Sequence, residues 1–469
     1  MTDDRSGEGL GAEPAEGAPV PISLVPRDEL TPALAGLPEA QAAWARAQGF
    51  EGRLGQWVSL PDQDGRMARV LLGWGDPVRR RRELFPAGQF AQAAPAGTYR
   101  LEAELAPDEA DAFALGWLLA RYRFDRYKRG ESAAEAHLLA PNGVDGHRLG
   151  VVAEGVYITR DLINTPANDM GPDELEAAAR KIAERHGAEI TVTEGAGLLE
   201  ANLPLIHAVG RASARPPRLI DLRWGAPEAP PIALVGKGVC FDTGGLDLKT
   251  AAGMALMKKD MGGAATVLGL AHMVMALGLK LRLRVLIPAV ENAVSGSAMR
   301  PGDVLRARNG LTVQVSNTDA EGRLALADAL TLAAEDAPQV ILDMATLTGA
   351  ARVALGPELP ALFTDDEVLA AELAAAGGRV ADPVWRLPLW PGYERLIEPK
   401  IADLDNAPSG GMAGAVTAAL FLRRFVGEGA WAHFDLYGWS QSDRPGRPTG
   451  GECQAARACL AVLEGRYGT

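Results

Sequence analysis

Cysteine is scarce in this sequence, which has 469 residues and only three cysteines, Cys240, Cys453 and Cys459. Three thiols cannot build a disulfide framework in so long a chain, so we expect a reducing, cytoplasmic setting. The acidic first twenty residues also lack the apolar segment of a secretory signal. We therefore expect residues 1–20 to be a disordered tail.

Long hydrophobic runs and an excess of positive charge are missing too. The longest apolar stretch, residues 264–279, is shorter than the roughly 20 residues that span a bilayer, so we expect no membrane role. Lysine and arginine number 47 against 60 acidic residues, a net charge of −13. This balance argues against nucleic acid as a partner, because no basic excess is available to displace its counterions. The four arginines at 79–82 are interpreted as a solvated face or a subunit contact.

Several catalytic motifs are absent as well. The sequence has no His-Glu-x-x-His and no Gly-x-Ser-x-Gly, and Lys237 lacks the spacing of a phosphate-binding loop. The Gly-x-Gly-x-x-Gly motif of dinucleotide-binding folds does not occur either. These absences exclude the helix-borne zinc peptidases, the serine hydrolases with a nucleophile elbow, and the common nucleotide sites.

What the chain does have is an alternation of apolar strands and helices. Buried-strand patterns at 231–236, 281–290, 313–317 and 339–347 are separated by helix patterns at 264–279 and 322–336. This alternation predicts an α/β fold with a mixed, largely parallel sheet flanked by helices, whose ligands lie beyond the carboxyl ends of the strands. An amphipathic helix is predicted at 108–129. The expected domains are the tail at 1–20, a smaller N-terminal α/β domain at 21–148, a connecting helix at 149–165 and a catalytic domain at 166–469.

Carboxylates and lysines gather in turns after these strands, within residues 237–249, 257–263 and 317–324. Clustered carboxylates are costly unless a cation neutralises them, and two divalent ions would do so. Ligation by oxygen without histidine suits Mn²⁺ or Mg²⁺, and Zn²⁺ stays open. Asp319 and Glu321 are two residues apart, so on an extended backbone both would face one metal pair, with Arg323 on the same side.

Five segments, in this order along the chain, carry a resemblance to a known family. They are Asn-Thr-Pro-Ala-Asn at 164–168, Val-Gly-Lys-Gly-x-x-Phe-Asp-x-Gly-Gly at 235–245, Met-Lys-x-Asp-Met-Gly-Gly at 257–263, Asn-Thr-Asp-Ala-Glu-Gly-Arg-Leu at 317–324 and Asp-Met-Ala-Thr-Leu-Thr-Gly-Ala at 343–350. Together they resemble the leucyl aminopeptidase family, the cytosolic two-metal aminopeptidases. The resemblance implies a metal-dependent aminopeptidase that hydrolyses the N-terminal residue from peptides, assembled as a homohexamer.

The resemblance also implies two divalent metal ions per subunit, Mn²⁺ or Zn²⁺ with Mg²⁺ as a further alternative. The more tightly bound ion would be held by Lys237, Asp242, Asp260 and Glu321. The exchangeable ion would be held by Asp242, Asp319 and Glu321. Lys237 must be neutral to donate a lone pair, so its pKa has to fall below about 10.4 through burial and the adjacent cation.

The remaining roles implied by the resemblance concern catalysis and substrate binding. Lys249 would stay charged and stabilise the oxyanion, while Arg323 would hold a bicarbonate ion that acts as general base. Met257 would line the side-chain pocket. The backbone of Thr346, Leu347 and Gly349 would bind the peptide.

Alternatives remain open at this point. The same carboxylates could serve another two-metal hydrolase, a phosphoesterase, or the chain could be a non-catalytic DNA-binding or regulatory protein on the same fold. Arg323 could instead form a structural salt bridge with Asp319 or Glu321. The bulky Tyr437 and Trp439 leave the preferred N-terminal side chain undetermined.

Overall fold

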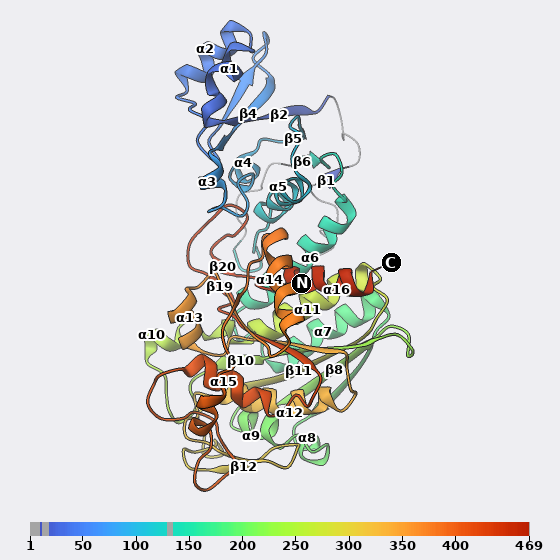
Figure 1. The fold of residues 1–469 in the computed structure, drawn as a ribbon, viewed down its shortest axis with the longest axis vertical. Helices are drawn as coiled ribbons and strands as arrows, with labels where there is room; N and C mark the ends of the chain where they lie inside the picture. The colour runs from blue at the N-terminus through green and yellow to red at the C-terminus, as the bar shows by residue number, and fades with distance from the viewer. Residues whose placement is uncertain (1–9, 12–17, 129–134, 469) are drawn as a thin grey trace. The chain divides into compact units, whose positions relative to one another are not determined.

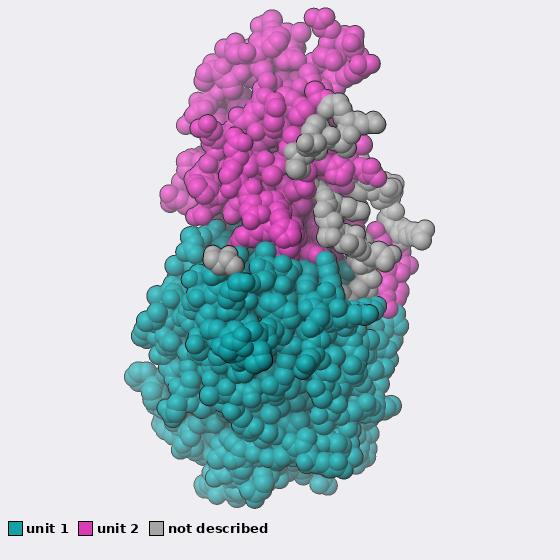
Figure 2. Space-filling model, turned by 90° about the vertical axis from the view of Figure 1, so that its right-hand side faces the viewer, with its two compact units in different colours: residues 1, 158–441, 450–469 teal, residues 2–157, 442–449 magenta. Residues whose placement is uncertain are grey.

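The computed structural model describes residues 10–11, 18–128 and 135–468, and these form two compact units (Figure 2). The larger unit comprises residues 158–441 and 450–469, and the smaller comprises residues 2–157 and 442–449. Helix α6 (Gly146–Asn164) runs through the expected connecting segment at 149–165 and contributes to both units. The domain bounds stay a prediction, and most of the expected tail at 1–20 lies outside the described residues.

A nine-stranded sheet forms the centre of the larger unit. Its central strands β18, β14, β9 and β11 run parallel, whereas β15, β8 and β7 are antiparallel to their inner neighbours. This confirms the predicted mixed, largely parallel sheet. In order across the sheet the strands are β16 (Trp385–Arg386), β15 (Ala361–Phe363), β18 (Ala430–Asp435), β14 (Val340–Ala345), β9 (Pro231–Gly236), β11 (Arg282–Asn292), β8 (Arg218–Trp224) and β7 (Glu189–Glu194), with β10 (Gly238–Asp242) pairing β11.

Helices cover both faces of this sheet (Figure 1). One face carries α7 (Pro172–His186), α11 (Gly262–Ala276), α14 (Glu367–Arg379) and α16 (Ala456–Tyr467), and the other carries α9 (Pro204–Gly210), α12 (Glu321–Ala334) and α15 (Gly414–Arg423). Every residue of α11 from Gly262 to Met275 is buried, as its predominantly apolar sequence predicts. None of the described helices is long and apolar enough to cross a membrane.

The region before α12 differs from the prediction. Strand β13 (Thr312–Gln314) belongs to a separate three-stranded sheet with β12 (Val304–Arg306) and β17 (Leu404–Asp405), so Asp319 does not follow a strand of the main sheet. The expected extended backbone is also wrong, because Glu321 begins α12. The Asn317 side chain accepts a hydrogen bond from the backbone N–H of Asp319 at 2.8 Å, and this local turn replaces an extended strand.

The smaller unit contains a six-stranded sheet and a buried helix, α5 (Pro107–Ala120). The predicted amphipathic helix at 108–129 is too long: α5 ends at Ala120, and residue 129 lies outside the described residues. It is not amphipathic either, since residues 113–120 are all buried. The Trp117 ring packs against Phe90 and Tyr99, so α5 is enclosed by an aromatic core. The other elements of this unit are β1 (Leu10–Gly11), β2 (Val20–Pro26), β3 (Trp57–Pro61), β4 (Met67–Gly75), β5 (Gly97–Leu101), β6 (Ala136–Leu139), α1 (Leu30–Ala35), α2 (Glu39–Ala47), α3 (Pro77–Arg80) and α4 (Gly88–Ala93).

Candidate functional site

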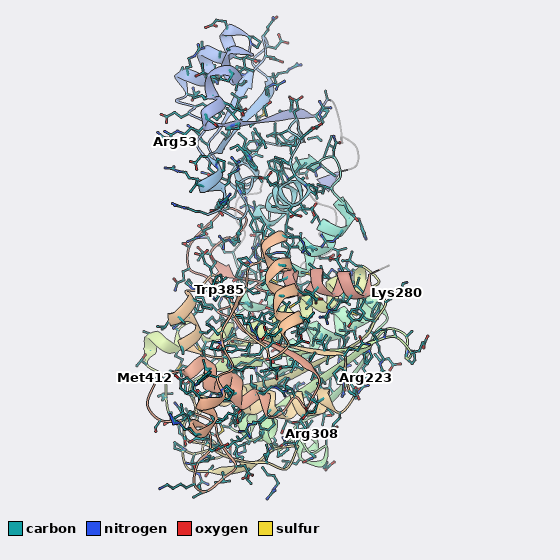
Figure 3. The ribbon with its side chains drawn as sticks, in the orientation of Figure 1. Arg53, Arg223, Lys280, Arg308, Trp385 and Met412 are labelled. Carbon is teal, nitrogen blue, oxygen red and sulfur yellow. The ribbon has the colours of Figure 1, made fainter. Side chains whose placement is uncertain are left out.

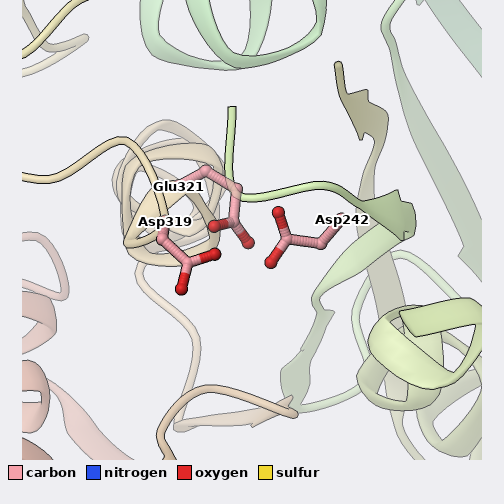
Figure 4. A group of neighbouring side chains, drawn as sticks. All are labelled: Asp242, Asp319 and Glu321. Atoms are coloured by element: carbon pink, nitrogen blue, oxygen red, sulfur yellow. The ribbon is translucent and has the colours of Figure 1, made fainter. Parts of the chain in front are cut away.

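Three carboxylates from two parts of the larger unit meet at one point. Asp242 is the last residue of β10, Asp319 lies just before α12, and Glu321 is the first residue of α12. Each offers a carboxylate oxygen, and these oxygens lie within 4.8 Å of one another (Figure 4). Three negative charges this close repel one another, so the group favours a cation between its members.

The buried oxygen atoms of this cluster fit that interpretation. Both carboxylate oxygens of Glu321 are buried and accept no hydrogen bond from the described residues, although Lys237 forms an ion pair with Oε1. Burial, together with the charge of Asp242, raises the pKa of Glu321 to about 8. Buried carboxylate oxygens that accept no hydrogen bond are costly, and they are the ligands that hard divalent cations prefer. The residues present therefore fit a divalent metal.

Lys237 connects this cluster to Asp260. It follows β9, and its Nζ lies 2.8 Å from Asp260 Oδ2 and 3.1 Å from Glu321 Oε1. Nζ also donates a hydrogen bond to the Thr346 carbonyl at 3.0 Å. Burial alone would lower the pKa of Lys237, but Asp260 and Glu321 outweigh it and raise the pKa above its usual value. Lys237 therefore has to lose a proton before its nitrogen can bind a metal.

Lys249 neutralises the other side of the cluster. Its Nζ lies 2.8 Å from Asp242 Oδ2 and also pairs with Asp319. Burial lowers the pKa of Lys249, but Asp242 and Asp319 raise it by more, so the net pKa is above the usual value. The Lys249 ammonium is therefore charged at neutral pH and lies next to the candidate metal ligands.

Arg323 lies on the first turn of α12 and is buried. Its guanidinium donates a hydrogen bond to the Asn406 carbonyl at 2.5 Å, while Nε has no hydrogen-bond partner among the described residues. Burial lowers the pKa of Arg323 to about 10, so the group stays charged at neutral pH. The alternative salt bridge to Asp319 or Glu321 is not formed within the described part of the chain. A buried cation with a spare donor is suited to an anion.

The expected substrate-binding residues border Asp260. Met257 is half-buried on the short helix η2 (Met257–Met261), which also carries Asp260. Thr346 and Leu347 directly follow β14, and Gly349 begins helix α13 (Gly349–Leu355). The Thr346 hydroxyl donates a hydrogen bond to Asp260 Oδ1 at 2.7 Å, which joins this segment to the candidate ligands.

Two side chains that support the site were not predicted. Asn292, at the end of β11, donates hydrogen bonds to Asp242 Oδ1 at 2.8 Å and to the Thr318 carbonyl at 3.0 Å. Asp435, at the end of β18, accepts hydrogen bonds from the backbone N–H groups of Leu347 and Thr348, both at 3.0 Å. Their shared signal is a polar residue at the carboxyl end of a buried strand, which is where ligands bind in such sheets.

Two cations and an aromatic ring lie beside the same segment. Lys259 precedes Asp260 on η2, Arg352 lies on α13, and Tyr437 follows β18. The Lys259 ammonium lies 4.9 Å and the Arg352 guanidinium 5.0 Å from the centroid of the Tyr437 ring. Burial lowers the pKa of Lys259 to about 8, which leaves it largely protonated at neutral pH.

Comparisons with known proteins agree with this geometry. The model of the cytosol aminopeptidase family, catalytic domain, matches residues 157–460, and that of the M17 aminopeptidase N-terminal domain matches residues 20–141. A probable cytosol aminopeptidase of Roseiflexus castenholzii is 44% identical over 371 residues, which is 76% of each chain.

Solved structures are similar over almost the whole chain. The cytosol aminopeptidase of Coxiella burnetii has a TM-score of 0.91 and 45% identity, covering 96% of this chain and 98% of that one. The bottromycin maturation enzyme BotP in complex with Mn has a TM-score of 0.84 and 35% identity, covering 96% of this chain and 100% of that one.

Proposed function

The chain belongs to the cytosol aminopeptidase family, and from its site we propose how its residues remove the N-terminal residue of a peptide. It is a metal-dependent aminopeptidase, and its substrates are peptides. One observation carries the assignment of the site: oxygens of Asp242, Asp319 and Glu321 lie within 4.8 Å of one another, and those of Glu321 accept no hydrogen bond from described residues.

The family resemblance assigns the metal ligands. Lys237, Asp242, Asp260 and Glu321 would hold the more tightly bound ion, and Asp242, Asp319 and Glu321 would hold the exchangeable one. Two divalent ions bound here lower the pKa of a water molecule and so supply the nucleophile near neutral pH. Manganese, Zn²⁺ and Mg²⁺ all suit these ligands, and the similarity to BotP, which was solved in complex with Mn, favours manganese.

Two positively charged side chains that are not proposed metal ligands, Lys249 and Arg323, can take part in the reaction. Lys249 is charged and adjacent to Asp242 and Asp319, so it can stabilise the negative charge that develops on the attacked carbonyl oxygen. Arg323, whose Nε has no hydrogen-bond partner among the described residues, would hold a bicarbonate ion, which would supply a general base.

The peptide lies along the segment after β14. Backbone groups of Thr346, Leu347 and Gly349 bind it, and Met257 lines the pocket for the first side chain. Thr346 is linked to Asp260 and Leu347 to Asp435, so the beginning of the segment is fixed next to the proposed ligand Asp260. A substrate held this way presents its first peptide bond to the metal pair.

We further propose a homohexamer located in the cytoplasm. Several large apolar side chains of the larger unit are more than half exposed, and Trp385 and Met412 are labelled in Figure 3. The hexamer is what the family resemblance implies, and contacts between its subunits would bury some of these side chains. All three cysteines are free thiols, which suits a reducing compartment.

The other two classes are not favoured. The family comparisons identify a peptidase, which does not favour a phosphoesterase. A non-catalytic DNA-binding protein would not need the candidate ligands, yet all of them are present.

Hydrolysis of a leucine arylamide and of a phosphomonoester, after chelation and again after adding Mn²⁺ or Zn²⁺, tests the proposed function. We expect metal-dependent hydrolysis of the arylamide alone. Arylamide hydrolysis that survives thorough chelation would contradict it.

A further inference from the structure

Lys259, Tyr437 and Arg352, here called the Lys259 cluster, form a positively charged group that the proposed reaction does not use. Lys259 is only 5% exposed. Within the described part of the chain its ammonium makes no hydrogen bond and no ion pair, and it lies over the face of the Tyr437 ring. Attraction to a ring face offsets only part of the cost of burying an unpaired ammonium.

Nearby carboxylates do not neutralise this charge. Asp260 is already bonded to Lys237 and to the Thr346 hydroxyl. Asp435 is bonded to the backbone of Leu347 and to Thr348. The Arg352 guanidinium lies over the same ring and likewise has no anionic partner among the described residues. Two cations around one ring without an anion indicate a place for a negatively charged ligand.

The adjacent Lys258 is a useful comparison, because its ammonium has a hydrogen-bond partner within the protein. It lies on the same short helix η2, but its Nζ donates a hydrogen bond to the Asn164 carbonyl at 2.6 Å. Its ammonium also lies 5.4 Å from the centroid of the Trp439 ring. Lys258 thus combines a ring contact with a hydrogen bond, whereas Lys259 has the ring contact alone.

The Lys259 cluster adjoins the proposed peptide-binding segment. A β-carbon added at Gly438, next to Tyr437, would lie 3.2 Å from Thr346 Cγ2 and 3.9 Å from the Lys259 carbonyl oxygen. Arg352 lies on α13, which begins at Gly349. A ligand bound between these residues would therefore be part of a peptide lying along residues 346–349.

We propose that Lys259, assisted by Arg352, binds a carboxylate of the peptide substrate beside the metal centre. This inference rests on the proposed function. The carboxylate has two sources: the acidic side chain of an N-terminal Asp or Glu, or the C-terminal carboxylate of a short peptide. In both cases the ammonium pairs with an anion that replaces the water lost on burial.

The test uses the full-length, metal-loaded enzyme and the variant Lys259→Met, which keeps an unbranched side chain, one atom shorter, and removes the charge. One ratio compares kcat/KM for glutamate arylamide with that for glutamine arylamide, neither of which has a C-terminal carboxylate. The second ratio compares the dipeptide Leu-Gly with its C-terminal amide. Lys280→Met is the matched control, because Lys280 is exposed beyond the end of α11 (Figure 3).

In Lys259→Met, at least one ratio should fall by about tenfold or more, the loss expected for a charged hydrogen bond. Hydrolysis of leucine arylamide should stay within about threefold of the parent. The ratio that falls identifies the source of the carboxylate. Arg352→Gln, at an exposed position, should lower the same ratio, and Lys280→Met should change neither.

Two results would overturn the proposal: both ratios unchanged in Lys259→Met, or leucine arylamide losing as much rate as the acidic substrates. If the parent enzyme hydrolyses no arylamide or dipeptide, the proposed function itself has failed. The subsite is then judged by calorimetry, comparing L-glutamate with L-glutamine and Leu-Gly with its amide. If the parent binds L-glutamate more tightly than L-glutamine, or Leu-Gly more tightly than its amide, and Lys259→Met loses that preference, the subsite is supported. If the parent binds both members of each pair equally, the subsite is rejected.

Discussion

Gly322 packs directly against the side chain of Lys237: a β-carbon at residue 322 would lie 2.3 Å from Lys237 Cε. The absence of a side chain at 322 is therefore what lets the Lys237 amine reach Asp260 and Glu321. The octapeptide at 317–324 thus supplies candidate metal ligands and, through Gly322, also leaves room for the Lys237 side chain.

Gly322→Ala should displace the Lys237 amine without unfolding the protein, since a lysine side chain can move. We expect the affinity for the more tightly bound metal to fall by about tenfold or more, as for loss of a group that orients a ligand. Metal titration followed by mass spectrometry measures this. Gly465→Ala is the control, because residue 465 lies in α16 with no atom near the added carbon. Unchanged metal affinity in Gly322→Ala would show that Lys237 is not a ligand.

Glu321→Gln should abolish catalysis and stabilise the metal-free protein. The variant keeps the shape of the side chain but removes a proposed ligand of both ions, so kcat/KM should fall by more than about three orders of magnitude. Burial and the charge of Asp242 make an ionised Glu321 unfavourable in the metal-free protein. A neutral glutamine avoids this cost, so the melting temperature in chelator should rise. Activity assays and thermal melts with and without chelator measure the two effects. Retained activity would refute the site.

The stability of the metal-free protein should depend on pH through Glu321. The pKa of Glu321 is raised to about 8 in the folded state, so that state binds a proton more tightly than the unfolded chain. This contribution is full below the unfolded pKa of about 4.3 and is lost as pH rises toward 8. Urea unfolding in chelator between pH 5 and 8 should therefore show falling stability. Glu321→Gln should flatten that slope, and an equally steep slope in the variant would assign the effect to other groups.

Bicarbonate should stimulate the enzyme through Arg323. We expect activity to fall when carbonate is removed from the buffer and to recover when bicarbonate is added, because the general base has been restored. Arg323→Met should lose about a hundredfold in kcat and should not respond to bicarbonate. Its metal content should match that of the parent, since Arg323 is not a proposed ligand. A variant that still responds to bicarbonate would place the anion elsewhere.

The sequence predicts the main sheet correctly and places three of the candidate ligands, Asp242, Asp319 and Glu321, in motifs whose carboxylates lie close together in the structure. Strand β9 and helix α11 are predominantly apolar segments, and such segments are buried in almost any α/β fold. The ligands were predicted from short motifs, in which spacing and residue type are visible in the chain itself.

Tertiary contacts explain what was not predicted. Asn292 donates a hydrogen bond to Asp242, which lies 50 residues earlier in the chain, and no local sequence pattern predicts that contact. Strand β13 pairs with the distant β17 instead of the main sheet, and an Asn317 turn sets the backbone before Glu321. Helix α5 ends at Ala120 although Tyr122 continues its spacing, because Tyr122 packs against Tyr157 instead.

Asp435 has a further consequence for how the enzyme is made. The segment that receives the peptide, at Leu347 and Thr348, is tied down by a carboxylate that is synthesised almost ninety residues later. A chain still growing on the ribosome therefore carries its metal ligands before it has an ordered place for a substrate.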